Sequence, residues 1–223
     1  MSIWGQLNLL DPASLIQAEM ILFHDHALMI ILGIFTLVSF MGLLLLKSKF
    51  TTRRVYEAQT LEILWTILPA GLLVALALPS LRLLYLLDEH PVDGKNVLKV
   101  IGKQWYWSYE SPVLGNVMFD SYMMPTDDLG PGEFRLLEVD NRAILPLDVC
   151  SLVLNTSADV IHSWALPSMG VKMDSVPGRL NSSSIEPKVV GVFYGQCSEI
   201  CGANHAFMPI AVEVVPSDVF MSI

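Results

Sequence analysis

Two cysteines, a histidine and a methionine lie within twelve residues near the C-terminus: Cys197, Cys201, His205 and Met208. Thiolate, thioether and imidazole groups select copper or zinc over hard cations such as magnesium or calcium. Zinc has no need of a thioether, whereas a blue-copper loop supplies Cys, His and Met in this order, with another His upstream. Because one copper needs only one thiolate, the second cysteine favours two thiolates that bridge two copper ions.

Such a centre needs another imidazole from outside the loop. The five histidines of the chain are His24, His26, His90, His162 and His205. Only His162 lies on a predicted strand, whereas His24 and His26 flank an apolar run of membrane length and are interpreted as interfacial residues. A disulfide between Cys197 and Cys201 is the alternative for the loop, but it would leave His205 and Met208 unexplained.

The composition indicates a membrane protein with a soluble part. The chain has 223 residues, 53% of them hydrophobic, and a mean hydropathy of +0.53. Five acidic and five basic residues precede residue 88, so the whole net charge of −9 lies after it. An acidic domain repels nucleic acid and steers basic partners toward itself, so no nucleic-acid partner is expected.

Two long uncharged runs predict a transmembrane hairpin. A helix is expected to begin at Asp11, an N-cap followed by Pro12, and to continue through a span of about residues 27–46. A second span is expected over about residues 63–87. Each run is long enough to cross a hydrocarbon core of about 30 Å. The hairpin domain is placed at residues 1–90.

A basic segment, residues 47–54, joins the two predicted spans. The positive-inside rule places this segment on the inner side, so both termini lie outside. No cleavable signal peptide is expected, because residues 1–10 carry no basic segment before an apolar run.

After residue 91 the pattern changes to short apolar runs between turn signals, typical of an antiparallel sandwich or barrel. The metal-binding loop falls between the last two predicted strands. Within the first, Trp105, Trp107 and Tyr109 are expected on one face as an aromatic ladder. Cys150, in another apolar run, is expected to be a buried structural thiol. The predicted strands are Val97–Tyr109, Phe134–Val139, Ser151–Asn155, Asp159–Leu166, Arg179–Ile185, Lys188–Tyr194 and Pro209–Val215.

Several motifs make nearly the whole chain resemble the cytochrome c oxidase subunit II family, of the mitochondrial kind. The resemblance implies a cupredoxin-like Greek-key domain at residues 91–223, in the intermembrane space, on a hairpin in the mitochondrial inner membrane. The motifs are His24-Asp-His26, Glu62-Ile-Leu-Trp-Thr-Ile-Leu-Pro-Ala70, Gln104-Trp-Tyr-Trp-Ser-Tyr-Glu110, Phe119-Asp-Ser-Tyr122, Leu136-Leu-Glu-Val-Asp-Asn141, His162-Ser-Trp-Ala165, Pro177-Gly-Arg-Leu-Asn181 and the loop from Tyr194-Gly-Gln-Cys197 onward.

The resemblance also implies a metal ligand set. Two copper ions would be held by His162, Cys197, Cys201, His205, Met208 and the main-chain carbonyl of Glu199. The Glu199 carboxylate would in addition bind a magnesium ion shared with the large, haem-bearing subunit.

Other roles follow from the same resemblance. Electrons from cytochrome c would enter the subunit at Trp105, and protons would enter a channel near Glu62 on the matrix side. Lys103 departs from the family, which often has histidine at this position. It adds a positive charge beside the surface on which cytochrome c would dock. Candidate acids for docking are Glu110, Asp120, Asp140 and Asp159.

The function expected from the resemblance is to pass electrons from cytochrome c to haem in the large subunit, for oxygen reduction coupled to proton pumping. Other oxidase subunits and the lipid bilayer are the further partners. The alternative of a different class is a membrane-anchored copper store or metallochaperone. A quinol oxidase subunit shares the fold but lacks the copper ligands, so the intact cysteine loop argues against it.

Overall fold

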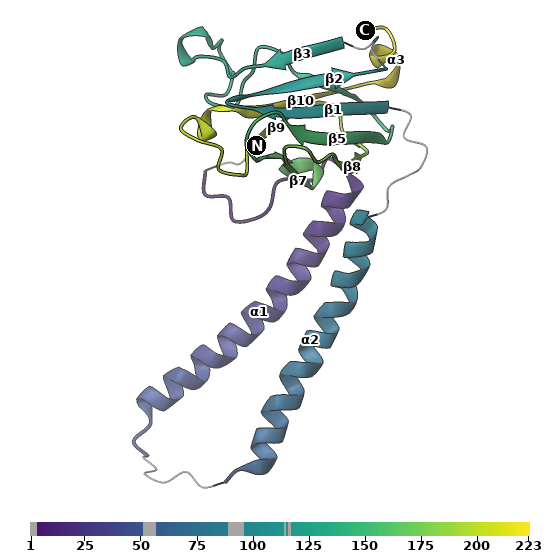
Figure 1. Ribbon diagram of the computed structural model, residues 1–223. Helices are drawn as coiled ribbons and strands as arrows, with labels where there is room; N and C mark the ends of the chain where they lie inside the picture. Colours follow the sequence, from purple (N-terminus) through teal and green to yellow (C-terminus); the bar gives the residue numbers. More distant parts are fainter. Residues whose placement is uncertain (1–3, 51–56, 89–95, 114, 116) are drawn as a thin grey trace. The chain divides into compact units, whose positions relative to one another are not determined.

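A computed structural model describes residues 4–50, 57–88, 96–113, 115 and 117–223 of the protein. The chain divides into two compact units. Residues 19–87 form a helical unit, and residues 1–18 together with 88–223 form a β unit (Figure 1). His90 and the basic residues Arg53 and Arg54 lie outside the described residues, so the predicted basic segment is described only in part.

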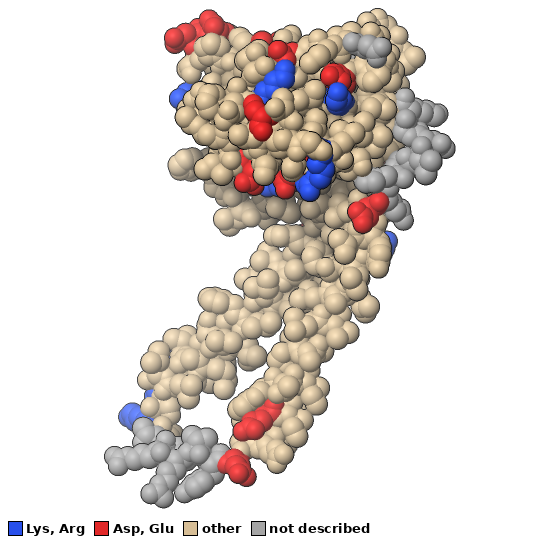
Figure 2. Space-filling model, viewed as in Figure 1, with Lys and Arg blue, Asp and Glu red and all other residues tan. Residues whose placement is uncertain are grey.

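Two helices carry the predicted spans. Helix α1 runs over Leu15–Lys47 and α2 over Gln59–Asp88, and both are long and apolar enough to cross a membrane. Their apolar side chains are exposed on all sides, as in a helix whose surroundings are lipid or other apolar helices. On the face drawn in Figure 2, charged side chains are nearly absent from the helical unit except near its helix ends.

The expected start of the first helix at Asp11 was wrong. Ser14 is the N-cap instead, because its hydroxyl accepts a hydrogen bond from the Gln17 N–H at 3.1 Å. The residues before it are extended and bonded within the β unit. The Ala13 N–H donates to the Ser168 carbonyl (2.8 Å), and the Lys188 N–H donates to the Ala13 carbonyl (2.7 Å). These bonds keep residue 13 out of the helix.

Among its described residues, the β unit contains ten strands and a short helix near the C-terminus, α3 (Ser217–Phe220). The largest sheet has the order β3-β2-β1-β5-β8 (Figure 1). A second sheet has the order β4-β10-β9, and β6 pairs with β7. The strands are β1 (Asn96–Lys103), β2 (Tyr106–Ser111), β3 (Val117–Ser121), β4 (Ala143–Pro146), β5 (Ser151–Ser157), β6 (His162–Leu166), β7 (Val171–Ser175), β8 (Asn181–Ile185), β9 (Gly191–Gln196) and β10 (Pro209–Val215).

The sheets enclose one apolar core, whose largest fully buried side chains include Trp107, Tyr109 and Trp164. Trp164 from β6 donates its indole N–H to the Tyr109 hydroxyl of β2 at 3.3 Å. An antiparallel sandwich or barrel was expected, but two of the strand pairs are parallel. Strand β1 runs parallel to β5, and β4 runs parallel to β10. These parallel pairs connect strands distant in sequence, which periodicity alone does not reveal.

The predicted strand over residues 97–109 is in fact a hairpin of β1 and β2. Its turn falls at Gln104 and Trp105. Trp107 and Tyr109 share a buried face as expected, but Trp105 lies in the turn and does not belong to the aromatic ladder.

The strand predicted at Phe134–Val139 is also absent. Leu136 has a φ of +67°, and the Leu137 and Glu138 N–H groups donate to the Phe134 carbonyl, which closes a turn. Only Val139 forms a bridge, with Met123. Strands β3, β4 and β7, of four or five residues each, were not predicted.

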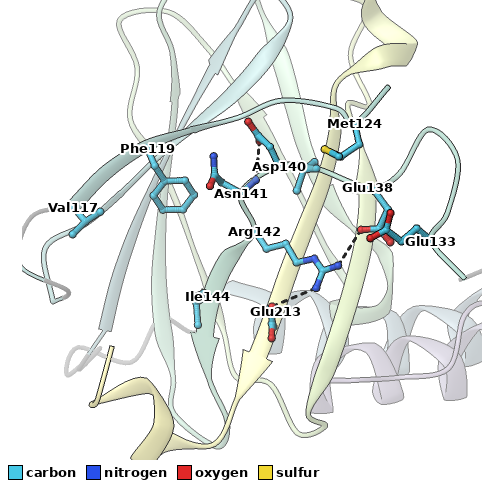
Figure 3. A pocket seen from close by; sticks show the side chains of 11 residues that line it. Val117, Phe119, Met124, Glu133, Glu138, Asp140, Asn141, Arg142, Ile144 and Glu213 are labelled. Carbon is cyan, nitrogen blue, oxygen red and sulfur yellow. Dashed lines mark hydrogen bonds and ion pairs between the residues drawn. The ribbon is translucent and has the colours of Figure 1, made fainter. Parts of the chain in front are cut away.

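A hollow of about 680 Å³ opens beside this turn, with Arg142 in its wall (Figure 3). The Arg142 guanidinium donates to the buried carboxylate of Glu138 at 3.1 Å and lies 3.5 Å from Glu213 on β10. The Tyr194 hydroxyl on β9 donates to the other Glu138 oxygen at 2.6 Å. Burial and then this bond raise the pKa of Tyr194 to about 12. The network ties the turn to β9 and β10, the two strands that flank the loop with both cysteines.

Removing Arg142 should therefore destabilise the β unit. The change Arg142→Met leaves the Glu138 carboxylate buried with only Tyr194 as a partner, a loss of about 3–5 kcal/mol in the free energy of unfolding. Lys99→Met is the matched control, because the Lys99–Glu110 pair is partly exposed and is worth about 0–1 kcal/mol. Urea unfolding of the full chain in detergent measures both, and equal losses would contradict this account.

Candidate metal centre

The predicted metal ligands come together inside the β unit. His162 lies on β6, and the other side chains lie on the loop between β9 and β10, as the sequence predicted. His162 is fully buried, and Cys197, Cys201 and Met208 are at most 7% exposed. His205 is half-buried and opens the short 3₁₀ turn His205–Phe207. The donor atoms of His162, Cys197 and Cys201 lie within 4.8 Å of one another.

The distances divide these donors between the two cysteines. The Cys197 Sγ lies 4.0 Å from the His162 Nδ1 and donates to the Glu199 carbonyl at 3.3 Å. The Cys201 Sγ lies 3.5 Å from the His205 Nδ1 and 3.5 Å from the Met208 Sδ. Each sulfur thus lies within 4.0 Å of an imidazole and within 3.5 Å of one further weak donor group.

The two cysteines are free thiols, with their sulfurs 4.0 Å apart. The S–S bond of a disulfide is about 2.05 Å long, so the structure does not contain the alternative disulfide between these two cysteines. A metal–thiolate bond is about 2.3 Å long, as for zinc, so one metal ion can reach both sulfurs at this separation. Two thiolates, two imidazoles and a thioether form a soft donor set that suits copper. The residues present therefore fit a copper centre.

The two thiols differ in acidity because burial, hydrogen bonds and neighbouring charge act on them unequally. Burial raises the pKa of Cys197, but hydrogen bonds from His162 and from main-chain groups outweigh burial and lower it to about 7. Burial and then the neighbouring Cys197 thiolate raise the pKa of Cys201 to about 12. A metal ion that binds both sulfurs must displace the proton of Cys201, so metal binding is coupled to proton release.

His162 is held by groups on every side. Its Nε2 lies 2.8 Å from the Asp159 Oδ1, which leaves Nδ1 directed at Cys197. Burial lowers the pKa of His162, but the bonds with Cys197 and Asp159 raise it overall. Trp107 packs edge-on against the ring with centroids 5.8 Å apart. The imidazole is therefore oriented before any metal binds.

Two glycines that the sequence reading overlooked make this convergence sterically feasible. A Cβ at Gly102 on β1 would lie 2.8 Å from the His162 ring. A Cβ at Gly195 on β9 would lie 1.8 Å from the Ala165 carbonyl of β6, so no side chain fits there. A glycine inside a predicted strand often marks such a close approach, and this signal was available in the sequence.

The loop is tied down near both cysteines. On the Cys197 side, the Ser198 N–H donates to the Ser163 carbonyl of β6 at 3.0 Å. On the Cys201 side, the Gln104 Nε2 donates to the Cys201 carbonyl at 2.8 Å. Gln104, in the β1–β2 turn, is a residue that the sequence reading did not single out, because only the folded chain brings it to the loop.

Trp105 lies against the same loop. A Cβ added at Gly202 would lie 3.0 Å from the Trp105 ring, and Gly202 has a φ of +129° that other residues rarely adopt. The Trp105 indole N–H is buried and makes no hydrogen bond within the described residues. The indole thus packs directly beside the main chain that follows Cys201.

All four candidate docking acids have partners within the β unit. Lys99 pairs with Glu110 (2.7 Å), and Asp120 accepts from Ser108 and lies 3.7 Å from the Lys103 Nζ. Asp140 accepts from the main-chain N–H groups of Tyr122 and Asn141. Asp159 accepts from Gln104 and Val160, and these bonds, with that of His162, outweigh burial and lower its pKa.

The remaining predicted residues lie apart from the sulfur cluster. The Glu199 side chain is exposed, and its carboxylate makes no hydrogen bond or ion pair within the described part of the chain. Glu62 lies in the first turn of α2. His24 lies 3.2 Å from Asp25, and His26 lines a hollow between α1 and α2, so neither joins a metal-binding group among the described residues. Cys150 is half-buried rather than buried, and burial still raises the pKa of its thiol.

Comparison with known proteins places this site in a family. The family model "Cytochrome C oxidase subunit II, transmembrane domain" matches residues 2–83, and "Cytochrome C oxidase subunit II, periplasmic domain" matches residues 96–215. The chain is 66% identical to cytochrome c oxidase subunit 2 of Albinaria turrita over 215 residues, which cover 96% of both chains. It is 52% identical to that of Branchiostoma floridae over 217 residues, 97% of this chain and 94% of the relative.

A solved structure agrees with the sequence relatives. The β unit is similar to the periplasmic domain of subunit II of cytochrome oxidase from Bradyrhizobium japonicum, with 50% sequence identity and a TM-score of 0.54. The match covers 58% of this chain and 90% of that domain. With two apolar helices, a cupredoxin-like domain and family matches along most of its length, the chain belongs to the cytochrome c oxidase subunit II family.

Proposed function

We propose that this chain is the electron-accepting subunit of a proton-pumping cytochrome c oxidase. It takes single electrons from reduced cytochrome c and passes them toward haem in the large catalytic subunit, where oxygen is reduced to water. The observation that carries the proposal is the convergence of His162, Cys197 and Cys201 in the β unit, with His205 and Met208 beside the second thiol. The named relatives support it.

The site would hold a pair of copper ions, with Cys197 and Cys201 as shared ligands. His162 and the Glu199 carbonyl lie beside the first thiol, and His205 and Met208 beside the second. When bound, such a pair supplies one-electron transfer with the charge spread over both metal ions. The protein keeps the ligands buried and fixed by β6, β9 and β10, so their geometry needs little adjustment when the charge changes.

Trp105 would be the point at which electrons enter. Its indole packs on Gly202, next to the carbonyl of Cys201, and is only partly exposed. Cytochrome c would dock through the acidic surface of the β unit, for which the net charge of −9 beyond residue 87 provides long-range attraction. Glu110, Asp120, Asp140 and Asp159 would contribute to this surface in addition to their internal bonds.

The remaining assignments concern the large subunit and the membrane. The free, exposed carboxylate of Glu199 would bind a magnesium ion shared with the large subunit, and Glu62 would lie where protons enter from the matrix. The helices α1 and α2 would cross the mitochondrial inner membrane, with both termini and the β unit in the intermembrane space. Lys47 at the end of α1 agrees with an inner position of the connecting segment.

The two-thiolate assignment predicts the outcome of Cys201→Ser. A hydroxyl has a far higher pKa than a thiol and does not bridge as an anion, so the chain should bind at most one copper ion. The donors left are His162, Cys197, His205 and Met208, those of a blue-copper site. Metal analysis and electron paramagnetic resonance measure this. Cys150→Ser is the control and should keep the wild-type signal, and two coupled copper ions in Cys201→Ser would refute the assignment.

The change Trp105→Phe should separate electron transfer from packing. Because the Trp105 indole N–H has no partner among the described residues, the change removes no hydrogen bond there. Stopped-flow oxidation of cytochrome c should show slower electron arrival, with cytochrome c affinity and copper content unchanged.

The control is Trp107→Phe. The Trp107 indole N–H donates to the Met208 carbonyl at 3.2 Å, so its loss leaves a buried acceptor unpaired, at a cost of about 1–3 kcal/mol. This variant should lose stability and copper content together. If Trp105→Phe also lost copper in proportion to its rate, Trp105 would be a packing residue.

The proposed orientation predicts how the chain meets a protease. In sealed mitoplasts, trypsin should digest the β unit from outside and spare Arg53 and Arg54 between the two helices. Permeabilised mitoplasts serve as the control, in which the same two arginines should be cleaved. Cleavage at Arg53 or Arg54 in sealed mitoplasts would show that the hairpin has the opposite orientation.

A further inference from the structure

We infer that Gln104 is a positioning residue that joins the two ligand-bearing segments of the metal centre. It lies in the turn between β1 and β2, and it contributes no donor atom to the sulfur cluster. Its side-chain amide and its main-chain amide each donate a hydrogen bond, one to each segment. This inference rests on the proposed copper function and assigns a residue that fixes the geometry of the same site.

The side-chain bond holds the Cys201 end of the loop. The Gln104 Nε2 donates to the Cys201 carbonyl at 2.8 Å. Within the described residues, no other hydrogen bond to that carbonyl is found. Cys197 is different, because its neighbour Ser198 bonds through its main chain to Ser163 of β6 (3.0 Å). The main chain beside one cysteine is thus bonded to the sheet, whereas the carbonyl of the other is bonded by a single side chain.

The main-chain bond holds His162 indirectly. The Gln104 N–H donates to the Asp159 Oδ2 at 2.6 Å, and the other oxygen, Oδ1, lies 2.8 Å from the His162 Nε2. The Asp159 carboxylate is therefore oriented from one side by the turn and orients the imidazole on the other. Partners of this kind are worth about ten- to a hundredfold in metal affinity.

Packing brings the turn close to the loop. A Cβ at Gly202 would lie 3.0 Å from the Trp105 ring and 3.2 Å from the Gln104 Nε2. The main chain after Cys201 therefore fits tightly under both residues of the turn. A shift of the turn moves the Cys201 carbonyl, while the Ser198–Ser163 bond keeps the Cys197 side in place.

Gln104→Met tests the inference, since methionine is neutral and of similar length but has no N–H to donate. The main-chain bond to Asp159 survives, so only the Cys201 side is released. In the purified oxidase, copper affinity measured against a chelator should fall about ten- to a hundredfold. Electron paramagnetic resonance should show unequal coupling to the two copper nuclei, because the two thiolates are no longer held alike.

Gln196→Met is the matched control. It makes the same chemical change next to Cys197, where the exposed Gln196 side chain makes no hydrogen bond within the described residues. Copper affinity and the resonance signal should match those of the wild type. Cytochrome c affinity should be the same in all three proteins, which separates positioning from a docking role of Gln104.

Hydrogen exchange of the metal-free full chain gives a readout independent of copper. In Gln104→Met, amides of residues 199–204 should exchange about two- to tenfold faster, the range expected for one lost hydrogen bond, while the Ser198 amide should not change. Unchanged exchange and unchanged copper affinity in Gln104→Met would overturn the inference. A wild-type chain without a copper pair would instead refute the proposed function, and the exchange result would still decide the role of Gln104.

Discussion

The structure depends on one constraint: two thiols must lie close together inside the β unit while remaining reduced and buried. Cys197 and Cys201 satisfy it with their sulfurs 4.0 Å apart and almost no exposed surface. Much of the β unit serves this arrangement. Strands β9 and β10 hold the loop ends, β6 supplies His162, and the hairpin of β1 and β2 closes over the loop. Apolar packing around Trp107 and Trp164 gives these strands a rigid support.

The residue types of the site could be predicted from the sequence, because ligand chemistry restricts which side chains suffice. The loop that contains both cysteines, His162 on a strand and the two long apolar runs were all correctly placed. The turn at Gln104 and Trp105 was not predicted, because alternating apolar residues continue through it. Only tertiary contacts fix the point at which the chain reverses direction. Gln104 opens one of the motifs that carry the family resemblance, but nothing in that motif indicates a contact with the cysteine loop. Its hydrogen bonds go to the Asp159 carboxylate, 55 residues further along the chain, and to the Cys201 carbonyl, 97 residues further along.

Charge illustrates the same limit. The net negative charge of the β unit could be predicted from composition. The ion pairs and the burial of each carboxylate could not. Glu110 forms an ion pair with Lys99, and Asp120 forms one with Lys103. Glu138 is buried in a hydrogen-bond network that holds a turn in place. In Figure 2, basic atoms lie beside acidic ones on the visible face of the β unit. Attraction for a basic partner therefore arises from the summed field more than from any single free carboxylate.

The N-terminal residues carry a consequence for the order of events during synthesis. Ala13 and Ser14 bond to Ser168, Met169 and Lys188, partners that lie about 155 residues or more further along the chain. These residues leave the ribosome before their hydrogen-bonding partners, which are translated only after both helices and most of the described strands. The anchoring of residues 13 and 14 therefore cannot be complete until the chain has been synthesised as far as Lys188. A chain truncated before residue 168 would leave these two residues without their native partners.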